Sequence, residues 1–134
     1  MQRLNELELG NTSFAIETTL AGLGYRQRIS RWKELGFRVI LFFIWLPCED
    51  LAIERVASRV AQGGHDIPIP DIRRRYARGL RNLTNIYLPI VDDAWVLNGA
   101  ITPPEVIWRR ADGNEWVSEI DAWQSIQSFD GGSW

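Results

Sequence analysis

The sequence predicts an α/β fold in which a parallel sheet is flanked by helices and followed by an antiparallel hairpin and a short helix. Segments rich in β-branched and aromatic residues alternate with segments whose apolar residues recur at helical spacing. An almost continuously apolar stretch at residues 38–46 is typical of a parallel strand buried on both faces. The 134 residues, of which 46% are hydrophobic, indicate one folded domain over residues 1–134.

The N-terminal part of the chain is predicted to contain a helix, a strand and a second helix. Leu4 and Leu7 share a helical face, so residues 2–9 are predicted to be helical, without an N-cap, as if the chain began within an element. Residues 14–19 are β-prone and end in polar residues, as in a buried strand that carries functional groups at its carboxyl end. The helix that follows is predicted to end at Gly36.

The apolar stretch at residues 38–46 is predicted to be the central strand of the sheet. Pro47 breaks this strand, and Glu49 and Asp50 place negative charge at the positive end of the next helix. The core-facing residues of that helix repeat at helical spacing: Ile53, Val56, Ala57, Val60 and Ala61.

An arginine-rich helix is predicted over residues 71–86, between the glycine pair Gly63-Gly64 and Pro89. Its apolar stripe consists of Ile72, Tyr76, Leu80, Leu83 and Tyr87, and its arginine stripe consists of Arg74, Arg78 and Arg81. Because the first stripe faces a core, the second is left to meet either solvent or a ligand.

The C-terminal part is predicted to form a strand, a hairpin and a helix. Residues 94–98 are β-prone, and strands at residues 106–110 and 115–119 flank a turn at Asp112-Gly113. Asp121 is predicted to cap a terminal helix, and residues 120–134 comprise this helix and a frayed tail.

The concentration of arginine suggests a site for an anion. Fourteen of the fifteen basic residues are arginines, and six of these lie between Arg59 and Arg81. Arginine presents a planar fork of donors that fits phosphate or carboxylate and keeps its charge at ordinary pH. The alternative is a solvated helix face whose arginines pair with neighbouring Glu and Asp residues.

Composition argues against several other classes of function. The net charge of −2 disfavours nucleic acid as a partner. The single cysteine, Cys48, excludes an intramolecular disulfide and a Cys-based zinc site, and no metal site is predicted. The longest apolar run, residues 39–47, is too short to cross a membrane. With no secretory start, a cytoplasmic location is expected. The tryptophans are interpreted as core and edge packing, because no exposed aromatics interleaved with basic residues are evident.

Several blocks in order resemble the zeta-toxin-like branch of P-loop kinases. The similarity extends over residues 13–98, and the later hairpin and helix are similar too. The matching blocks are Phe14-Ala15-Ile16-Glu17-Thr18-Thr19-Leu20-Ala21-Gly22, Trp45-Leu46-Pro47, Leu51-Ala52-Ile53-Glu54-Arg55-Val56, Gly63-Gly64-His65-Asp66-Ile67-Pro68 and Ile72-Arg73-Arg74-Arg75-Tyr76.

The resemblance implies transfer of a phosphoryl group from ATP, with Mg²⁺ as the accompanying metal, to a hydroxyl of a small molecule. The toxins of this family act on UDP-N-acetylglucosamine, and an antitoxin is a further partner that the resemblance allows. By resemblance, Glu17 and Thr19 hold the acceptor, and Arg59 stabilises the transferred phosphate.

The resemblance also implies a lid over residues 63–76. His65 lies where the toxins carry a second lid arginine, and Arg74 or Arg75 takes over that charge, with Arg78 on the same helix. Each assignment has a structural alternative. Glu17 would pair with an arginine, Thr19 would cap a turn, and His65 would be an ordinary loop residue.

The sequence contains no Gly-x-x-x-x-Gly-Lys-Ser/Thr motif, which P-loop kinases use to hold phosphates and Mg²⁺. The only lysine, Lys33, lies within a predicted helix, and Gly22-Leu23-Gly24 lacks a third glycine. We interpret the chain as an N-terminally truncated domain that comprises the acceptor-site and lid half, and we expect no transfer from ATP by this chain alone. The alternative is a noncatalytic module that binds an anion or a protein, or the product of a gene remnant.

Overall fold

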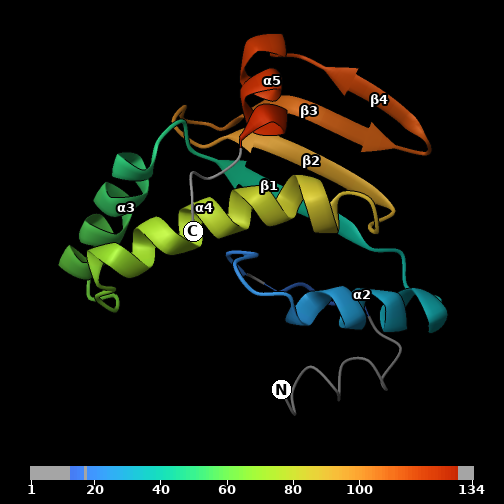
Figure 1. Ribbon diagram of the computed structural model, residues 1–134, viewed down its shortest axis with the longest axis horizontal. Helices are drawn as coiled ribbons and strands as arrows, with labels where there is room; N and C mark the ends of the chain where they lie inside the picture. The colour runs from blue at the N-terminus through green and yellow to red at the C-terminus, as the bar shows by residue number, and fades with distance from the viewer. Residues whose placement is uncertain (1–12, 17, 130–134) are drawn as a thin grey trace.

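The protein is an α/β structure built on a four-stranded mixed sheet in the order β1-β2-β3-β4. The computed structural model describes residues 13–16 and 18–129 (Figure 1). In chain order the elements are α2 (Gly24–Glu34), β1 (Ile40–Trp45), α3 (Glu49–Ala61), α4 (Ile69–Asn82), the π-helix η1 (Leu83–Tyr87), β2 (Asp93–Asn98), β3 (Glu105–Ala111), β4 (Asn114–Val117) and α5 (Ile120–Ser128).

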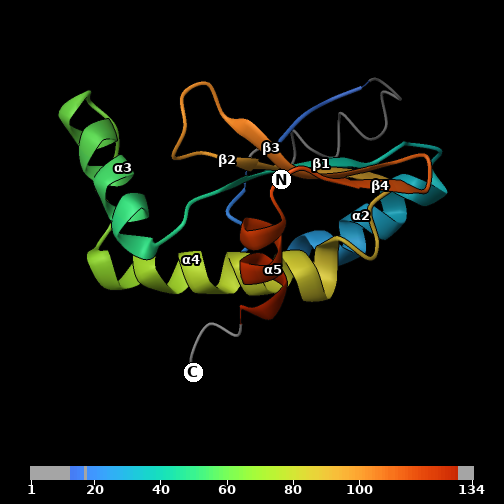
Figure 2. The same cartoon turned by 90° about the horizontal axis from the view of Figure 1, so that it is seen from above.

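The helices cover one face of the sheet. Seen edge-on, α2, α4 and α5 all lie on the same side of the strands (Figure 2). The predicted α/β class is therefore confirmed. The predicted parallel sheet is confirmed only in part, because β1 and β2 are parallel while β2–β3 and β3–β4 are antiparallel.

The prediction that residues 38–46 form a central strand covered on both faces is wrong in position. Residues 40–45 of this stretch form β1, but β1 lies at an edge of the sheet that the described residues build. Its alternate residues Ile40, Phe42 and Ile44 are 48%, 61% and 44% exposed. A continuous apolar run cannot distinguish a strand buried on both faces from a strand with one bare face, because only the neighbouring elements decide this.

The predicted strand at residues 14–19 is also not found, since residues 13–16 and 18–19 form no strand. Phe14 packs edge-to-face against Trp32 and Phe37, with ring centroids 5.5 and 5.4 Å apart. The Thr18 hydroxyl accepts a hydrogen bond from the Leu20 amide at 3.2 Å. Leu20, with φ of 59°, turns the backbone away from an extended course. In this segment the ring packing of Phe14 and the turn at Leu20 are found where strand pairing was expected.

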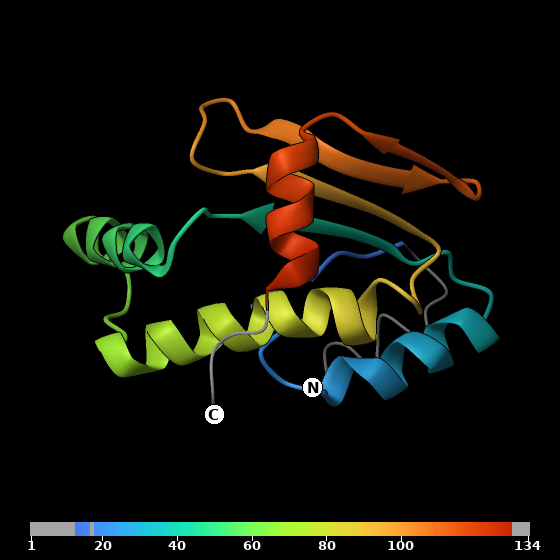
Figure 3. The same cartoon turned by 45° about the horizontal axis from the view of Figure 1, so that its top comes forward.

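Helix α2 ends as predicted, with Gly36 in the left-handed region at φ of 92°. Helix α3 begins as predicted at Glu49, with Asp50 in its first turn. The predicted core face of α3 is wrong, however, because α3 has no buried residue. Figures 1 and 3 show the reason: α3 stands beyond the end of the sheet, beside the first part of α4.

Helix α4 and η1 confirm the predicted arginine helix and its apolar stripe. Ile72, Leu80, Leu83 and Tyr87 are buried, and Tyr76 is half-buried. The helical segment begins at Ile69 and runs through η1 to Tyr87, two residues before Pro89. Among the helices that the structure describes, α4 separates its apolar and polar faces most strongly, so periodicity alone located it.

The C-terminal hairpin is confirmed, with strands β3 and β4 around Asp112 and Gly113 at φ of 53° and 79°. The terminal helix is confirmed as α5, but Asp121 is not its cap. Glu119 occupies the N-cap position and Asp121 lies in the first turn. The predicted helix at residues 2–9 and the predicted frayed end at 130–134 lie outside the described residues.

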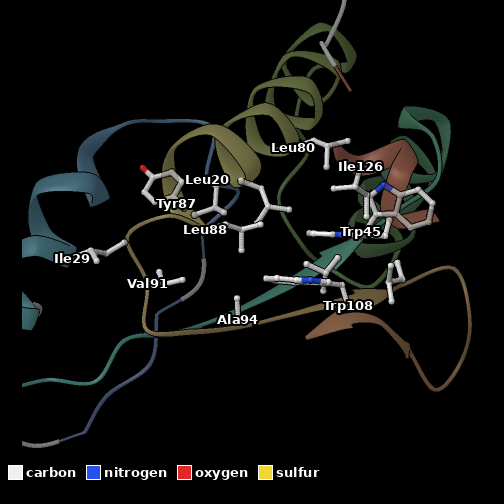
Figure 4. Packing of buried hydrophobic residues seen from close by; sticks show 14 of the residues in the cluster. Leu20, Ile29, Trp45, Leu80, Tyr87, Leu88, Val91, Ala94, Trp108 and Ile126 are labelled. Carbon is white, nitrogen blue, oxygen red and sulfur yellow. The ribbon is translucent and has the colours of Figure 1, made fainter. Parts of the chain in front are cut away.

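The core lies between the sheet and its helical layer. Figure 4 shows side chains of α4, the sheet and α5 meeting there, among them Leu80, Trp108 and Ile126. The rings of Trp108 and Trp123 are stacked with centroids 4.4 Å apart. Within the described ranges, no helix has the length and apolarity needed to cross a bilayer.

An ion pair joins the start of β1 to β2. Arg38 donates from Nε to Asp93 Oδ2 at 3.0 Å and from Nη2 to Oδ1 at 2.8 Å. These hydrogen bonds, together with the charges of Arg38 and Arg110, hold the pKa of Asp93 below its usual 3.8. A carboxylate with a lowered pKa stabilises the folded state above its usual pKa, and this contribution is lost as the pH falls through the lowered value.

Replacing Asp93 with asparagine is therefore expected to lower the melting temperature at neutral pH and to matter less as the solution becomes acidic. Thermal melts of the wild type and of the variant between about pH 7 and about pH 3 measure the difference between their melting temperatures. Asp112→Asn is the control, because Asp112 contacts the same arginine at 3.1 Å but is 83% exposed. A melting-temperature difference between Asp93→Asn and wild type that does not change with pH would contradict the role of this ion pair.

Candidate functional site

An open pocket of about 240 Å³ lies at the carboxyl ends of the parallel strands β1 and β2. It is lined by Leu46, Leu51, Glu54, Arg55, Ser58, Gly99 and Ala100. Leu46 and Gly99 directly follow the two strands, and the polar residues come from α3. In α/β proteins, ligands bind outside the carboxyl ends of parallel strands, so this pocket is in the position expected for a site.

Arg55 is the cation that the structure adds to the predicted site. Its Nη2 donates a hydrogen bond to the carbonyl oxygen of Gly99, which joins α3 to the end of β2. Arg59 follows four residues later on the same helix face, one turn from the pocket. The four-residue spacing of these two arginines is visible in the sequence. Arg55 becomes a candidate site residue only because the structure shows that it lines the pocket.

The glycine pair fixes the chain immediately after Arg59. Gly63 has φ of 95°, a conformation that residues with a side chain rarely adopt. The Arg59 carbonyl accepts hydrogen bonds from the amides of Gln62 at 3.1 Å and Gly64 at 2.7 Å. A Cβ at Gly64 would lie 2.9 Å from that carbonyl oxygen. Both glycines are therefore required by a tight turn at the end of α3.

The arginines of α4 fall into two groups. Arg73 pairs with Glu49 and lies 4.0 Å from Asp50, and Arg74 pairs with Asp71 at 2.8 Å. These contacts match the alternative of a solvated face paired with acidic neighbours. Arg75, in contrast, is exposed and makes no ion pair or hydrogen bond through its side chain with any described residue.

The predicted lid residues outside α4 are also exposed. Arg59 and His65 make no side-chain hydrogen bond or ion pair within the described ranges. Arg78 is exposed one turn after Arg74. The guanidinium groups of Arg59 and Arg75 are therefore available to an anion from solution.

Thr19 lies at a different place from the lid arginines. Its hydroxyl accepts a hydrogen bond from the Ala21 amide at 3.4 Å, as in the alternative in which Thr19 caps a turn. Its carbonyl oxygen rests against Gly79 of α4 so closely that a Cβ at Gly79 would overlap it. Glu17, the other predicted acceptor residue, lies outside the described residues.

Two further contacts hold the segment after Thr19 against α4 and η1. Asn82 Nδ2 donates to the Leu20 carbonyl, and the Tyr87 hydroxyl donates to the Gly22 carbonyl, both at 2.7 Å. Burial is the main cause that raises the pKa of Tyr87. Sequence reasoning missed Gly79 and Asn82 as contact residues. The one available signal was a glycine in the middle of a strongly helical pattern.

The structure does not bring all the predicted residues together. The loop that carries His65 leads into the first turn of α4, whereas Thr19 packs ten residues further along at Gly79. This separation is about 15 Å along the helix axis. Thr19 and His65 therefore lie near different parts of α4.

Tyr76 ties α4 to the pocket. Its hydroxyl donates a hydrogen bond to the carbonyl of Leu46, a pocket residue, at 2.7 Å. Burial, with smaller contributions from Cys48 and Glu49, raises the pKa of Tyr76 to about 12. Tyr76 is therefore a neutral donor at ordinary pH and positions α4 relative to the carboxyl end of β1.

The described residues do not fit ATP and Mg²⁺. No group of three or more His, Cys, Asp or Glu side chains suited to a metal ion occurs among them. The sequence has no glycine-rich loop with lysine, which would bind the phosphates. No catalytic step through ATP follows from these residues.

The bare face of the sheet carries an aromatic row that the sequence analysis missed. Phe42, Trp95, Arg109 and Trp116 are paired across the four strands. The Arg109 guanidinium carbon lies 4.7 Å from the Trp95 ring centroid and 4.1 Å from that of Trp116. Trp95 is half-buried and Trp116 lies on the edge strand β4, so the interpretation of the tryptophans as core and edge packing is not contradicted. The sequence analysis missed that strand pairing places an arginine between them, because these residues are distant in sequence.

The fold and pocket define an α/β protein with a small open pocket at the carboxyl ends of its parallel strands. The chain is 36% identical over 63 residues to an uncharacterized protein of Haemophilus influenzae. The match includes 47% of this chain and 45% of that protein, so the chain spans about half the length of this relative. No protein-family model and no solved structure matches the chain.

Proposed function

We propose that this chain is the acceptor-binding and lid part of a zeta-toxin-like small-molecule kinase. In this proposal it binds an anionic hydroxyl compound, such as a UDP-amino-sugar, and does not transfer phosphate from ATP by itself. The observation that carries the proposal is the exposed, unpaired state of Arg59 and Arg75 among the described residues, next to arginines of the same helix pair that do have acidic partners.

The electrostatics of the α3–α4 pair support this assignment. Arg73 pairs with Glu49 and Arg74 pairs with Asp71, so the positive charge of each is already balanced within the protein. Arg59 and Arg75 keep their charge without a partner from the described residues. A guanidinium binds a phosphate through two parallel hydrogen bonds, and such charge-assisted bonds are about twice as strong as neutral ones.

The position of Arg59 supports a phosphate-contacting role. It lies one helical turn from Arg55, whose hydrogen bond to Gly99 forms part of the pocket wall. The glycine turn after Arg59 leaves its side chain at the end of α3, in solvent. In the proposed complex the pocket holds the neutral part of the ligand, and Arg59 and Arg75 contact its phosphates.

A ligand-binding experiment tests this proposal. The melting temperature of the purified chain is measured with UDP-N-acetylglucosamine, with inorganic phosphate and with ATP-Mg²⁺. We expect the sugar nucleotide at a hundredfold excess over its dissociation constant to stabilise the fold by about 2.7 kcal/mol. Phosphate alone is expected to give a smaller shift, because it lacks the groups that fill the pocket.

Matched arginine variants separate recognition from general charge. Arg59→Ala and Arg75→Ala are each expected to weaken sugar-nucleotide binding by about ten- to a hundredfold, the range for a lost hydrogen bond to a charged group. Arg73→Ala removes the same charge from an arginine that already has acidic partners, and is expected to leave binding unchanged. An equal loss in all three variants, or no shift with any compound, would contradict the proposal. So would phosphoryl transfer from ATP by this chain alone.

A further inference from the structure

Helix α3 lies at the margin of the fold. It has no buried residue, and Figures 1 and 3 show it beside the first part of α4, beyond the end of the sheet. Segments with few buried contacts open locally at a lower free-energy cost than global unfolding. A ligand-binding residue on such a helix has a defined position only if some other contact holds the helix in place.

The connections at the two ends of α3 are irregular. Residues 46–48 lead into the helix from β1, and residues 62–68 lead out of it to α4 without forming a helix or a strand. The ion pair between Glu49 and Arg73 links the first turn of α3 to α4, but these side chains are 39% and 48% exposed. Exposed ion pairs contribute little to stability. The middle of α3 therefore depends on a contact of its own.

Arg55 provides a contact at the middle of α3. Among the described residues, it makes the only side-chain hydrogen bond from α3 to the sheet or to the loop after β2, and its Nη2 donates to the carbonyl oxygen of Gly99. Gly99 is itself held at the end of the parallel ladder, because its amide donates to the Trp45 carbonyl at 2.8 Å. Arg55 therefore fastens the middle of α3 to the carboxyl ends of the strands.

The contact requires a glycine at position 99. A Cβ there would lie 2.5 Å from Cγ2 of Ile44 and 3.2 Å from Nη2 of Arg55. Glycine permits a close approach to its backbone that a side chain would obstruct. Arg55 and Gly99 are therefore matched to each other, although 44 residues separate them in the sequence.

We propose that Arg55 is a positioning residue for Arg59. Its hydrogen bond to Gly99 holds α3 in place beside the pocket, and without this bond α3 pivots on its two connecting segments. Arg59 follows Arg55 by four residues, about 6 Å along the helix axis and on the same face. Holding Arg55 therefore sets where the Arg59 guanidinium lies relative to the pocket. The positioning role rests on the proposed function, whereas the contact between α3 and Gly99 does not.

Hydrogen exchange of the ligand-free chain, followed by mass spectrometry, tests whether Arg55 holds α3. In Arg55→Ala the backbone amides of α3 are expected to exchange about tenfold faster than in wild type, the factor for loss of a hydrogen bond to a charged group. The amides of β1 and β2 are expected to exchange at unchanged rates. Because alanine favours a helix more than arginine does, a weaker helix propensity cannot explain faster exchange.

Arg59→Ala is the matched control for the exchange experiment. It removes the same charge from the same helix one turn later, and Arg59 makes no side-chain hydrogen bond or ion pair with any residue that the structure describes. The α3 amides of this variant are expected to exchange at the wild-type rate. Arg55→Lys keeps a charged donor but not the planar guanidinium, so its exchange is expected to lie between that of wild type and that of Arg55→Ala.

A double-mutant comparison tests whether Arg55 acts through Arg59. Calorimetry measures the dissociation constant of UDP-N-acetylglucosamine for wild type, for the two alanine variants and for the variant that combines them. Arg55→Ala is expected to weaken binding about tenfold when Arg59 is present and to change nothing when Arg59 is already alanine. Equal weakening in both backgrounds would show that Arg55 contacts the ligand itself, which would overturn the positioning role.

The outcomes distinguish this inference from the proposed function. If α3 exchanges equally fast in wild type and in Arg55→Ala, or equally fast in the two alanine variants, Arg55 does not hold the helix and the inference is wrong. If wild type does not bind the sugar nucleotide, the proposed function and the positioning role both fail. The exchange rates then still decide whether the contact with Gly99 holds α3.

Discussion

Replacing Gly79 with alanine is expected to destabilise the protein by about 3 kcal/mol, the upper part of the range for overpacking. A Cβ at this position would overlap the carbonyl oxygen of Thr19, and backbone atoms cannot rotate away as a flexible side chain can. The gain in helix propensity from glycine to alanine, about 1 kcal/mol, opposes this effect but does not cancel it. Urea denaturation followed by circular dichroism measures the difference.

Gly24→Ala is the matched control for this substitution. Gly24 is the first residue of α2, and a Cβ there would meet no atom within 4 Å. It is expected to be neutral or to stabilise the fold by up to about 1 kcal/mol. If Gly79→Ala were as stable as wild type, the segment from Thr19 to Gly22 would not be docked on α4 in solution.

Replacing Trp108 with alanine is expected to cost about 3–5 kcal/mol, which is comparable to the total stability of a small domain. Trp108 is 1% exposed and stacks on Trp123, so its loss leaves a large cavity between β3 and α5. The expected result is a chain that is largely unfolded at room temperature, seen as loss of a cooperative urea transition.

Trp108→Phe keeps an aromatic ring at the same position and is the informative comparison. The indole Nε1 of Trp108 is buried and has no hydrogen-bond partner among the described residues. Removing an unsatisfied donor relieves a cost of about 1–3 kcal/mol, which offsets part of the lost packing. We expect this variant to remain folded with a sharp transition. A loss equal to that of Trp108→Ala would show that the indole nitrogen has a partner that the structure does not reveal.

The amphipathic helices and the hairpin were predictable because their signals are local. The stripe of α4 from Ile72 to Tyr87 follows from helical spacing, and the turn at Asp112 and Gly113 follows from residues that tolerate positive φ. Each of these features depends on residues only a few positions apart. The helical stripe and the turn could therefore be predicted without any knowledge of tertiary contacts.

The candidate site was predictable only in part. The sequence identified Arg59, the glycine pair and the arginines of α4, because residue type and local spacing carry that information. It could not show that Asp71 and Glu49 neutralise Arg74 and Arg73. It also could not show the pocket that Arg55 joins to Gly99 across 44 residues of sequence. Charge pairing and concavity depend on which elements become neighbours.

The resemblance to zeta-toxin-like kinases remains a prediction, and ligand binding by Arg59 and Arg75 is its most direct test. The aromatic row of Phe42, Trp95, Arg109 and Trp116 is a separate feature. It results from the pairing of the four strands, and it does not require the kinase interpretation.

By itself, the sequence determined the α/β class, the helix that carries the arginines, the glycine turn and the hairpin, because hydrophobic period and turn chemistry act over short distances. Only the tertiary structure decided that β1 lies at an edge of the sheet that the described residues build, that α3 has no buried face and that residues 14–16 and 18–19 do not form a strand. An apolar segment is equally suited to the centre and to the edge of a sheet, and long-range strand pairing selects between them.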